Sequence, residues 1–164
     1  TGRATYFSKY DIVRDDYRAV MASCALPGFC RPVKVGDRYY YDGGVADSIP
    51  LHHAIEQGCT KMVVILSNPR NFVKKPEAHR PLYKHMLHKY PKTIQSIDNR
   101  HINYQASIDL ASRLEKEGYV FIFAPSRHMP LSTFSKDAAL EQDLYDLGVA
   151  DYEARAEELK HFLN

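Results

Sequence analysis

Two short apolar runs, separated by segments with helical spacing, constrain the fold of this chain more than any other feature. The runs are Lys61 to Leu66 and Tyr119 to Ala124. Both have the length of a strand, far below the roughly 20 residues that a membrane-spanning helix needs, and Lys61 to Leu66 predicts a buried strand. From Arg80 to Glu117, apolar residues recur at spacings of three and four, as on one face of a helix. This alternation predicts an α/β fold with helices covering a central sheet.

The first fifty residues predict a strand, a helix and a hairpin, in that order. The expected elements are a strand over residues 4–8, a helix capped by Asp15 or Asp16 and ended by Pro27-Gly28, and hairpin strands over 33–35 and 38–41. Gly36-Asp37 has the composition of the two-residue turn that joins such strands. The chain is therefore expected to reverse its direction at Gly36-Asp37.

Further helices are predicted on either side of the apolar runs. Ser48 and Pro50 can open a short helix, and Gly58 follows its expected end. The C-terminal residues predict two amphipathic helices, the first broken at Gly148 and the second capped by Asp151.

Composition excludes several classes of protein. A length of 164 residues favours one domain, and a net charge of +2 is too near neutral to predict a nucleic-acid partner. Three cysteines without paired spacing favour a reducing, cytoplasmic location over a disulfide framework. The pairs His52-His53 and His85 with His88 lack a third ligand, so we expect no metal and no other cofactor. The chain starts with neither Met nor an apolar signal region, which indicates a piece of a longer protein.

Asp42-Gly43-Gly44 is the stretch with the clearest chemical potential. Asp-Gly is a frequent turn sequence, so one interpretation is a structural turn with no chemistry. However, Gly36-Asp37 already turns the hairpin, and a second turn sequence is not needed to reverse the chain. Two glycines let backbone approach a neighbour closely, and strand ends are where α/β folds place reactive groups. Asp42 is therefore our candidate general base, with Gly43 and Gly44 supporting it.

These residues also resemble the second catalytic motif of a known family. The matching stretches are Tyr6-Phe7, Ala22-Ser23-Cys24-Ala25 with Pro27-Gly28, Asp42-Gly43-Gly44, Ser48 before Pro50, and the run Lys61 to Leu66. Together they resemble the bacterial patatin-like phospholipases, which are lipid acyl hydrolases. The resemblance implies a three-layer α/β/α fold and a Ser-Asp dyad, in which a serine attacks an ester and Asp42 accepts its proton without a histidine. It further implies a lipid or other acyl-ester substrate. Residues 1–124 would be the C-terminal portion of the catalytic domain, and residues 125–164 a helical extension.

The nucleophile that the resemblance implies is absent from this chain. The sequence has no Gly-x-Ser-x-Gly and no Gly-rich oxyanion loop, and both would lie upstream of Thr1. Because losing the nucleophile of a serine protease lowers kcat on the order of 10⁶-fold, we expect the chain alone to be inactive. Ser67 precedes Asn68-Pro69, which prevents the immediate helix of a nucleophile elbow, so we interpret it as a loop residue. Cys24 is expected to pack at a helix end.

Charge is unevenly distributed along the chain. Residues 70–100 hold eight Lys or Arg and two acidic residues, a net +6, whereas residues 136–164 carry a net −5 from three basic and eight acidic residues. The basic stretch is interleaved with Tyr83, Met86, Leu87 and Tyr90. Such a face can contact anionic lipid, with Lys84, Lys89 and Lys92 as the candidate contacts, or it can be a solvated helix face.

Two functions remain open at this point. The first is a lipid acyl hydrolase, cytoplasmic and peripheral to the membrane, to which this chain contributes the aspartate. The second is a non-catalytic module of the same fold that binds a membrane or an acidic partner through its basic segment. Because a sheet cut before its nucleophile strand exposes an unpaired edge, we also expect the chain to self-associate.

Overall fold

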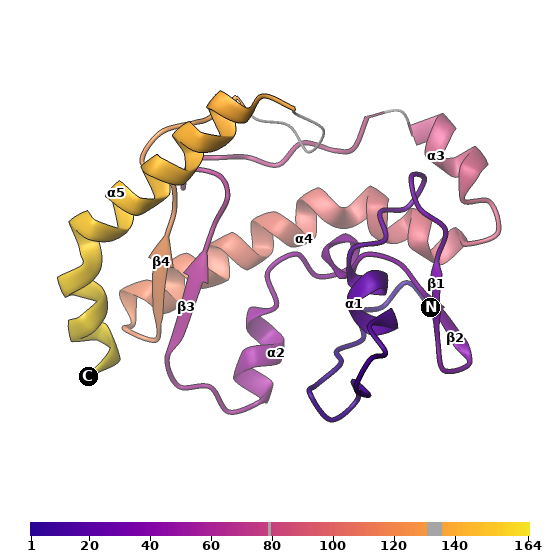
Figure 1. Ribbon diagram of the computed structural model, residues 1–164, viewed down its shortest axis with the longest axis horizontal. Helices are drawn as coiled ribbons and strands as arrows, with labels where there is room; N and C mark the ends of the chain where they lie inside the picture. The colour runs from indigo at the N-terminus through magenta and orange to yellow at the C-terminus, as the bar shows by residue number, and fades with distance from the viewer. Residues whose placement is uncertain (79, 131–135) are drawn as a thin grey trace. The chain divides into compact units, whose positions relative to one another are not determined.

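The structure, a computed structural model, describes residues 1–78, 80–130 and 136–164. It is a mixed α/β arrangement with short elements first and the long helices later in the chain (Figure 1). In order, the elements are α1 (Arg18–Ser23), β1 (Val33–Val35), β2 (Arg38–Tyr40), the 3-10 helix η1 (Gly43–Val45), α2 (Leu51–Glu56), β3 (Met62–Ile65), α3 (Arg80–Met86), α4 (Pro91–Lys116), β4 (Val120–Phe123) and α5 (Ala138–Leu163).

The chain divides into two compact units. The first unit contains residues 1–50 and 74–107, and the second contains residues 51–73 and 108–164. Helix α4 starts in the first unit and ends in the second. The division expected at residue 124 stays a prediction.

The first unit confirms the predicted hairpin. Strands β1 and β2 are antiparallel, with Val33 opposite Tyr40 and Val35 opposite Arg38. Gly36 adopts a φ of 56° in the turn, which suits a residue without a Cβ. The core of this unit is built by Val45, Leu87, Ile94 and Ile97, with Tyr41, Tyr83 and Tyr90 packed against it.

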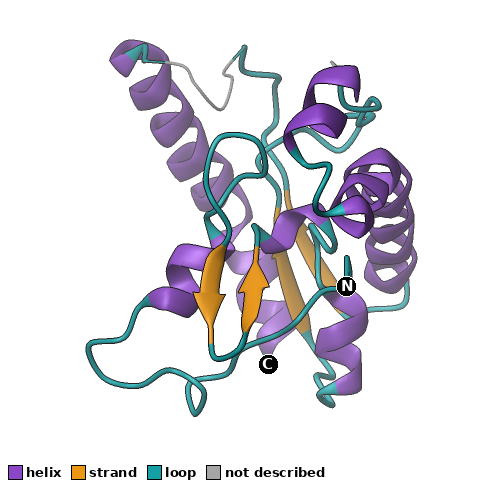
Figure 2. Cartoon of the chain, turned by 90° about the vertical axis from the view of Figure 1, so that its right-hand side faces the viewer, coloured by secondary structure: helices purple, strands orange, loops and turns teal. Residues whose placement is uncertain are grey.

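The second unit confirms both predicted strands at the apolar runs. Strands β3 and β4 are parallel, from Met62 opposite Val120 to Ile65 opposite Phe123. Figure 2 shows the strands of the two sheets as two pairs. Strand β4 is buried along most of its length and α5 packs against it, with the Phe121 and Phe162 rings 5.7 Å apart. The Arg155 guanidinium lies 4.4 Å from the Phe121 ring centre, a favourable cation–π distance.

The prediction that the run at Lys61 to Leu66 is a buried strand is wrong for one of its faces. Val64 is only 8% exposed, but Val63 is 41% and Ile65 is 80% exposed. Successive side chains of a strand point to opposite faces, so β3 buries one face and leaves the other open. Each sheet has two strands within the described residues, and the expected central sheet is not observed there.

Several predicted element boundaries also differ. The helix expected from Arg80 to Glu117 is interrupted after Met86, and α4 begins at Pro91. Proline lacks a backbone N–H and is accommodated in the first turn of a helix, which explains the break. Residues 4–8 form no strand, and α1 begins at Arg18, whose amide donates to Asp16 Oδ1 at 3.2 Å.

The C-terminal pair of helices is a single helix, α5. Asp137 caps it by accepting hydrogen bonds from the amides of Ala139 and Leu140, both at 3.1 Å. Gly148 lies inside the helix, because one glycine lowers helix stability without ending a helix. Asp151 caps no second helix and instead accepts a hydrogen bond from the Ser126 amide at 2.9 Å.

Candidate active site

Asp42 lies directly after the hairpin and immediately before η1. Its Oδ1 accepts a hydrogen bond from the Gly44 amide at 2.7 Å, and its own amide donates to the Ala25 carbonyl at 2.9 Å. Asp42 is half-buried, and its Oδ2 makes no hydrogen bond with the part of the chain that the structure describes. One carboxylate oxygen is therefore held by the backbone, and the other has no hydrogen-bond partner among the described residues.

Packing on both sides of Asp42 fixes the loop to the core of the first unit. The Tyr41 ring meets the Tyr90 ring edge-on at 5.6 Å, and Val45 is only 6% exposed. Burial, and to a smaller extent the nearby Tyr90, raises the pKa of Tyr41. The three residues Asp42-Gly43-Gly44 thus lie between two anchored side chains.

The two glycines of the motif are not equivalent. A Cβ added at Gly44 would lie 3.1 Å from Asp42 Oδ1, closer than an ordinary van der Waals contact. A Cβ added at Gly43 would meet no atom of the described chain within 4 Å. The expected close approach of backbone to carboxylate is therefore made at Gly44.

The Gly44 carbonyl is held by two side chains. Arg100, on α4, donates from Nε at 2.9 Å, and the Ser48 hydroxyl donates at 2.6 Å. The Arg100 guanidinium also pairs with Glu77 at 3.1 Å, and Glu77 lies 3.7 Å from the Lys74 amine.

Sequence reasoning missed Arg100 and Glu77 as parts of this site. Arg100 lies 56 residues from Gly44, and in the sequence it is one of many basic residues in a helical pattern. The only local signal is its spacing. Ile94 and Ile97 are buried in the core with Val45, and Arg100 follows Ile97 by three residues, on the same helix face.

The three arginines of the basic segment are each paired with a carboxylate. Arg80 pairs with Asp98 at 2.6 Å, and the Tyr83 hydroxyl donates to the same carboxylate at 2.7 Å. Arg80 and then Tyr83 hold the pKa of Asp98 well below its usual range. Burial, and then the bond to Asp98, raises the pKa of Tyr83 to about 12.

The three lysines proposed to contact lipid are exposed. Lys84 lies on α3, Lys89 lies between α3 and α4, and Lys92 lies in the first turn of α4. Of the apolar residues between them, Leu87 is only 2% exposed, and Tyr83 and Tyr90 pack on the core. Fewer apolar side chains are therefore exposed near the lysines than expected. Of the four that were expected, Met86 is 49% exposed.

Other candidate groups take structural or surface positions. Cys24 lies at the end of α1, as expected, but it is exposed there, so the expectation that it packs is wrong. Ser67 is exposed in the loop after β3, as expected. Within the described residues, no three His, Cys, Asp or Glu side chains are grouped to hold a metal ion. No helix among these residues is long and apolar enough to cross a membrane.

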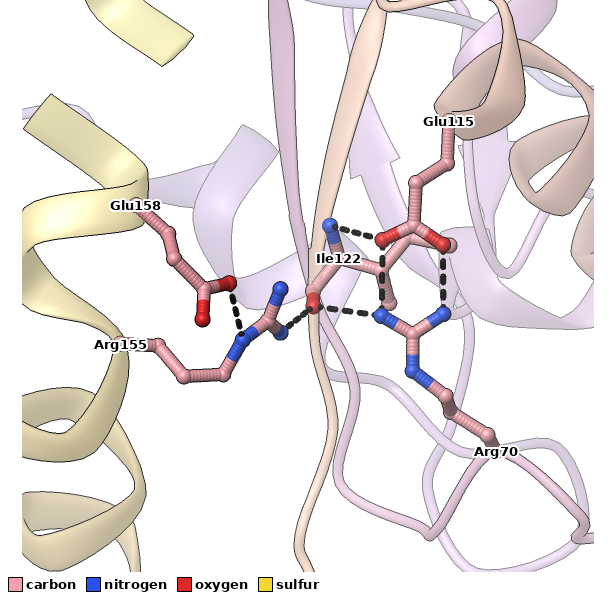
Figure 3. Close-up of polar contacts among 5 residues, drawn as sticks. All are labelled: Arg70, Glu115, Ile122, Arg155 and Glu158. Carbon is pink, nitrogen blue, oxygen red and sulfur yellow. Dashed lines mark hydrogen bonds and ion pairs between the residues drawn. The ribbon is translucent and has the colours of Figure 1, made fainter. Parts of the chain in front are cut away.

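A second polar cluster joins the elements of the second unit (Figure 3). Arg70 makes two hydrogen bonds to Glu115, at 2.6 and 2.7 Å, and one to the Ile122 carbonyl at 3.0 Å. Arg155 donates to the same carbonyl at 2.7 Å and pairs with Glu158. The Arg70 guanidinium lowers the pKa of Glu115. These side chains connect α4, β4, α5 and the loop after β3.

Two segments of this chain match known protein families. Residues 9–55 match the patatin-like phospholipase family, and residues 90–164 match a domain of unknown function, DUF6363. The chain is 30% identical over 135 residues to the uncharacterized protein YjjU of Escherichia coli (strain K12). That alignment covers 79% of this chain and 37% of the relative. No solved structure matches.

Asp42, Gly43, Gly44 and Ser48 fall inside the first matched segment, and Arg100 falls inside the second. The chain thus carries part of a patatin-like phospholipase domain, over residues 9–55, followed by a DUF6363 domain over residues 90–164.

Proposed function

We propose that this chain supplies the aspartate of a Ser-Asp dyad in a lipid acyl hydrolase whose serine lies outside these 164 residues. The observation that carries the proposal is the Asp42 carboxylate inside the patatin-like segment. Its Oδ1 is bound to the Gly44 amide, and its Oδ2 has no hydrogen-bond partner in the described part of the chain. The substrate class is a phospholipid or another acyl ester. The absence of Gly-x-Ser-x-Gly from the sequence supports the placement of the serine elsewhere.

In the proposed reaction, Asp42 accepts the hydroxyl proton as the serine oxygen attacks the ester carbonyl. The tetrahedral intermediate then expels the alcohol, which takes that proton, and the serine is left acylated. Water hydrolyses the acyl group in the second half of the cycle, with Asp42 again accepting and returning a proton. The bond to Gly44 holds the carboxylate in one orientation through both halves.

The proposed fold extends beyond the two small sheets. We propose that β3 and β4 belong to a larger central sheet of a three-layer domain, with the strand that carries the nucleophile as an additional member. The exposed face of β3 supports this, because Ile65 on a completed sheet would be covered by a neighbouring layer.

The experiment is a comparison of Asp42→Asn with Asp37→Asn in the full-length protein that contains this chain. Asp37 is the matched control, an exposed aspartate in the hairpin turn. With a short-chain nitrophenyl ester as substrate, Asp42→Asn should lose at least about 10²-fold in kcat, because it keeps the shape and removes the proton acceptor. Asp37→Asn should match the parent, and retention of most activity by Asp42→Asn would contradict the proposal.

Membrane attachment through the exposed lysines is a second proposal, which applies to a catalytic and to a non-catalytic protein. On the short helix α3, Lys84 is exposed, and so are Leu82 and Met86, to 59% and 49%. Exposed basic and apolar side chains in one segment are typical of reversible binding to anionic lipid.

Vesicle sedimentation with and without anionic lipid tests the attachment. Changing Lys84, Lys89 and Lys92 to Glu should abolish binding, whereas the same change at Lys9, Lys34 and Lys116 alters net charge equally and should weaken it far less. Equal binding to neutral and anionic vesicles, or no binding at low salt, would contradict attachment through these lysines and leave the segment a solvated helix face.

A further inference from the structure

We propose that Arg100, in the DUF6363 segment, is a positioning residue for Asp42, acting through Gly44 and held in place by Glu77. This inference rests on the proposed function, because it assigns a role within the same site. It gives the second matched segment a task in the chemistry of the first.

The packing of α4 places Arg100 against the loop that contains Asp42. Ile94 and Ile97 pack with Val45, which fixes the rotation of the first half of α4 against the loop that contains Asp42. Arg100 follows one turn later on the same face, and its side chain is 28% exposed. Its Nε donates to the Gly44 carbonyl at 2.9 Å.

The backbone of Gly44 needs support from outside the loop, because glycine is flexible. Its amide holds Asp42 Oδ1, and its carbonyl, on the other side of the same Cα, accepts from Arg100 and Ser48. Glycine has the freest backbone of all residues, so an unheld Gly44 would allow its amide to rotate away from the carboxylate. A larger residue cannot supply the rigidity, because its Cβ would crowd Asp42 Oδ1 at 3.1 Å. The side chain of Arg100 supplies it from outside the loop, together with the Ser48 hydroxyl four residues along the chain.

Arg100 is in turn supported by Glu77. Glu77 accepts from the guanidinium at 3.1 Å, so one edge of Arg100 binds the carbonyl and the other binds a carboxylate. A guanidinium has donors in a fixed planar arrangement, which lets it join two acceptors at defined angles. Arg100 binds the Gly44 carbonyl rather than the Asp42 carboxylate, which makes it a positioning residue.

The test uses Arg100→Met and Arg100→Lys in the full-length protein, with Arg113→Met as the control. Arg113 is an exposed arginine on the same helix. With the soluble nitrophenyl ester, Arg100→Met should lower kcat on the order of 10²-fold with KM little changed, as expected for a misplaced catalytic group. Lysine keeps a charged donor, so Arg100→Lys should recover part of kcat, and Arg113→Met should match the parent.

A second variant keeps the inference testable if Arg100→Met fails to fold. Glu77→Gln keeps the arginine at position 100 but removes its charged partner. This variant should lower kcat roughly 10-fold, the equivalent of about 1.4 kcal/mol. A kcat equal to that of the parent in Arg100→Met, or in Glu77→Gln where only that variant folds, overturns the inference.

The Asp42→Asn measurement separates the two possible failures. If Asp42→Asn is inactive and Arg100→Met behaves like Arg113→Met, the positioning role is wrong and the proposed function stands. If Asp42→Asn remains active, the proposed function itself fails.

Discussion

The two oxygens of the Asp42 carboxylate are in different situations. Oδ1 accepts from the Gly44 amide and so caps η1, which is the structural turn that Asp-Gly sequences favour. Oδ2 has no hydrogen-bond partner within the described residues. The structural and the catalytic interpretations of this residue are therefore compatible, because each needs one oxygen.

Gly44→Ala and Gly43→Ala form a matched pair that tests this geometry. The new Cβ at Gly44 would lie 3.1 Å from Oδ1 and displace the carboxylate by a few tenths of an ångström, whereas the Cβ at Gly43 would enter open space. We expect Gly44→Ala to lower kcat of the full-length enzyme about 10-fold or more, and Gly43→Ala to lower it less. Ester hydrolysis under identical conditions measures the difference, and equal losses would contradict the assignment of the close approach to Gly44.

Of the residues in the candidate site, the sequence predicts those that are adjacent in the chain. Asp42, Gly43 and Gly44 can be recognised together because they adjoin and because another turn sequence precedes them. Arg100 and Glu77 reach the site only after α4 and the loop before α3 have folded against it. Its spacing from Ile94 and Ile97 is the only local signal that distinguishes Arg100 from the other basic residues of its segment.

Among the elements, α5 shows how a sequence signal can be overridden. Gly148 is exposed, and no described atom lies within 4 Å of the position that a Cβ would occupy. We therefore expect Gly148→Ala to raise the free energy of unfolding of the chain by about 0.5–1 kcal/mol, the usual difference between Gly and Ala in a helix interior. Urea denaturation followed by circular dichroism measures it.

Gly118→Ala is the control for Gly148→Ala, because the same substitution should have the opposite effect on stability at position 118. Gly118 follows α4 with a φ of 82°, a conformation that costs an alanine about 1–2 kcal/mol. This variant should be less stable than the parent. If Gly148→Ala were also destabilising, the helix would be broken at that position, as the sequence pattern alone suggests.

The elements that could be predicted are those with a strong local signal. The hairpin has a two-residue turn, and β3 and β4 are apolar runs bounded by turn residues. The long helices were less well predicted because spacing alone continues across Pro91 and does not reveal that one glycine in α5 is tolerated. Residues 4–8 have strand composition but no partner strand within the described residues.

For the chain as a whole, stability at low pH depends on the cluster in Figure 3. Glu115 accepts from Arg70 and from the Ile122 amide, and its pKa in the folded chain is lowered. A lowered pKa stabilises the fold fully above the unfolded-state pKa, near 4.5, and this stabilisation is lost as the pH falls through the folded-state pKa. Glu115→Gln should therefore cost about 1–2 kcal/mol at pH 7 and progressively less below pH 4.5.

Urea denaturation at pH 7 and at pH 3 tests the dependence. Glu117→Gln is the control, because Glu117 is exposed two residues further along. A destabilisation of Glu115→Gln that is the same at both pH values would show that the carboxylate charge is not the source of the effect.

Exposed apolar side chains on β3 predict that the isolated chain associates. Ile65 is 80% and Val63 41% exposed, on a strand that pairs only with β4 within the described residues. An open strand with an apolar face is a template for pairing with another chain, and a charge on it prevents such pairing. Sedimentation velocity at tens of micromolar should therefore show dimers or larger species, and Ile65→Lys should shift the chain toward monomer.

Ile102→Lys is the control for this experiment. Ile102 is 57% exposed, but it lies within helix α4 and not on a strand. A monomeric parent chain, or equal effects of the two variants, would show that β3 is not the associating surface.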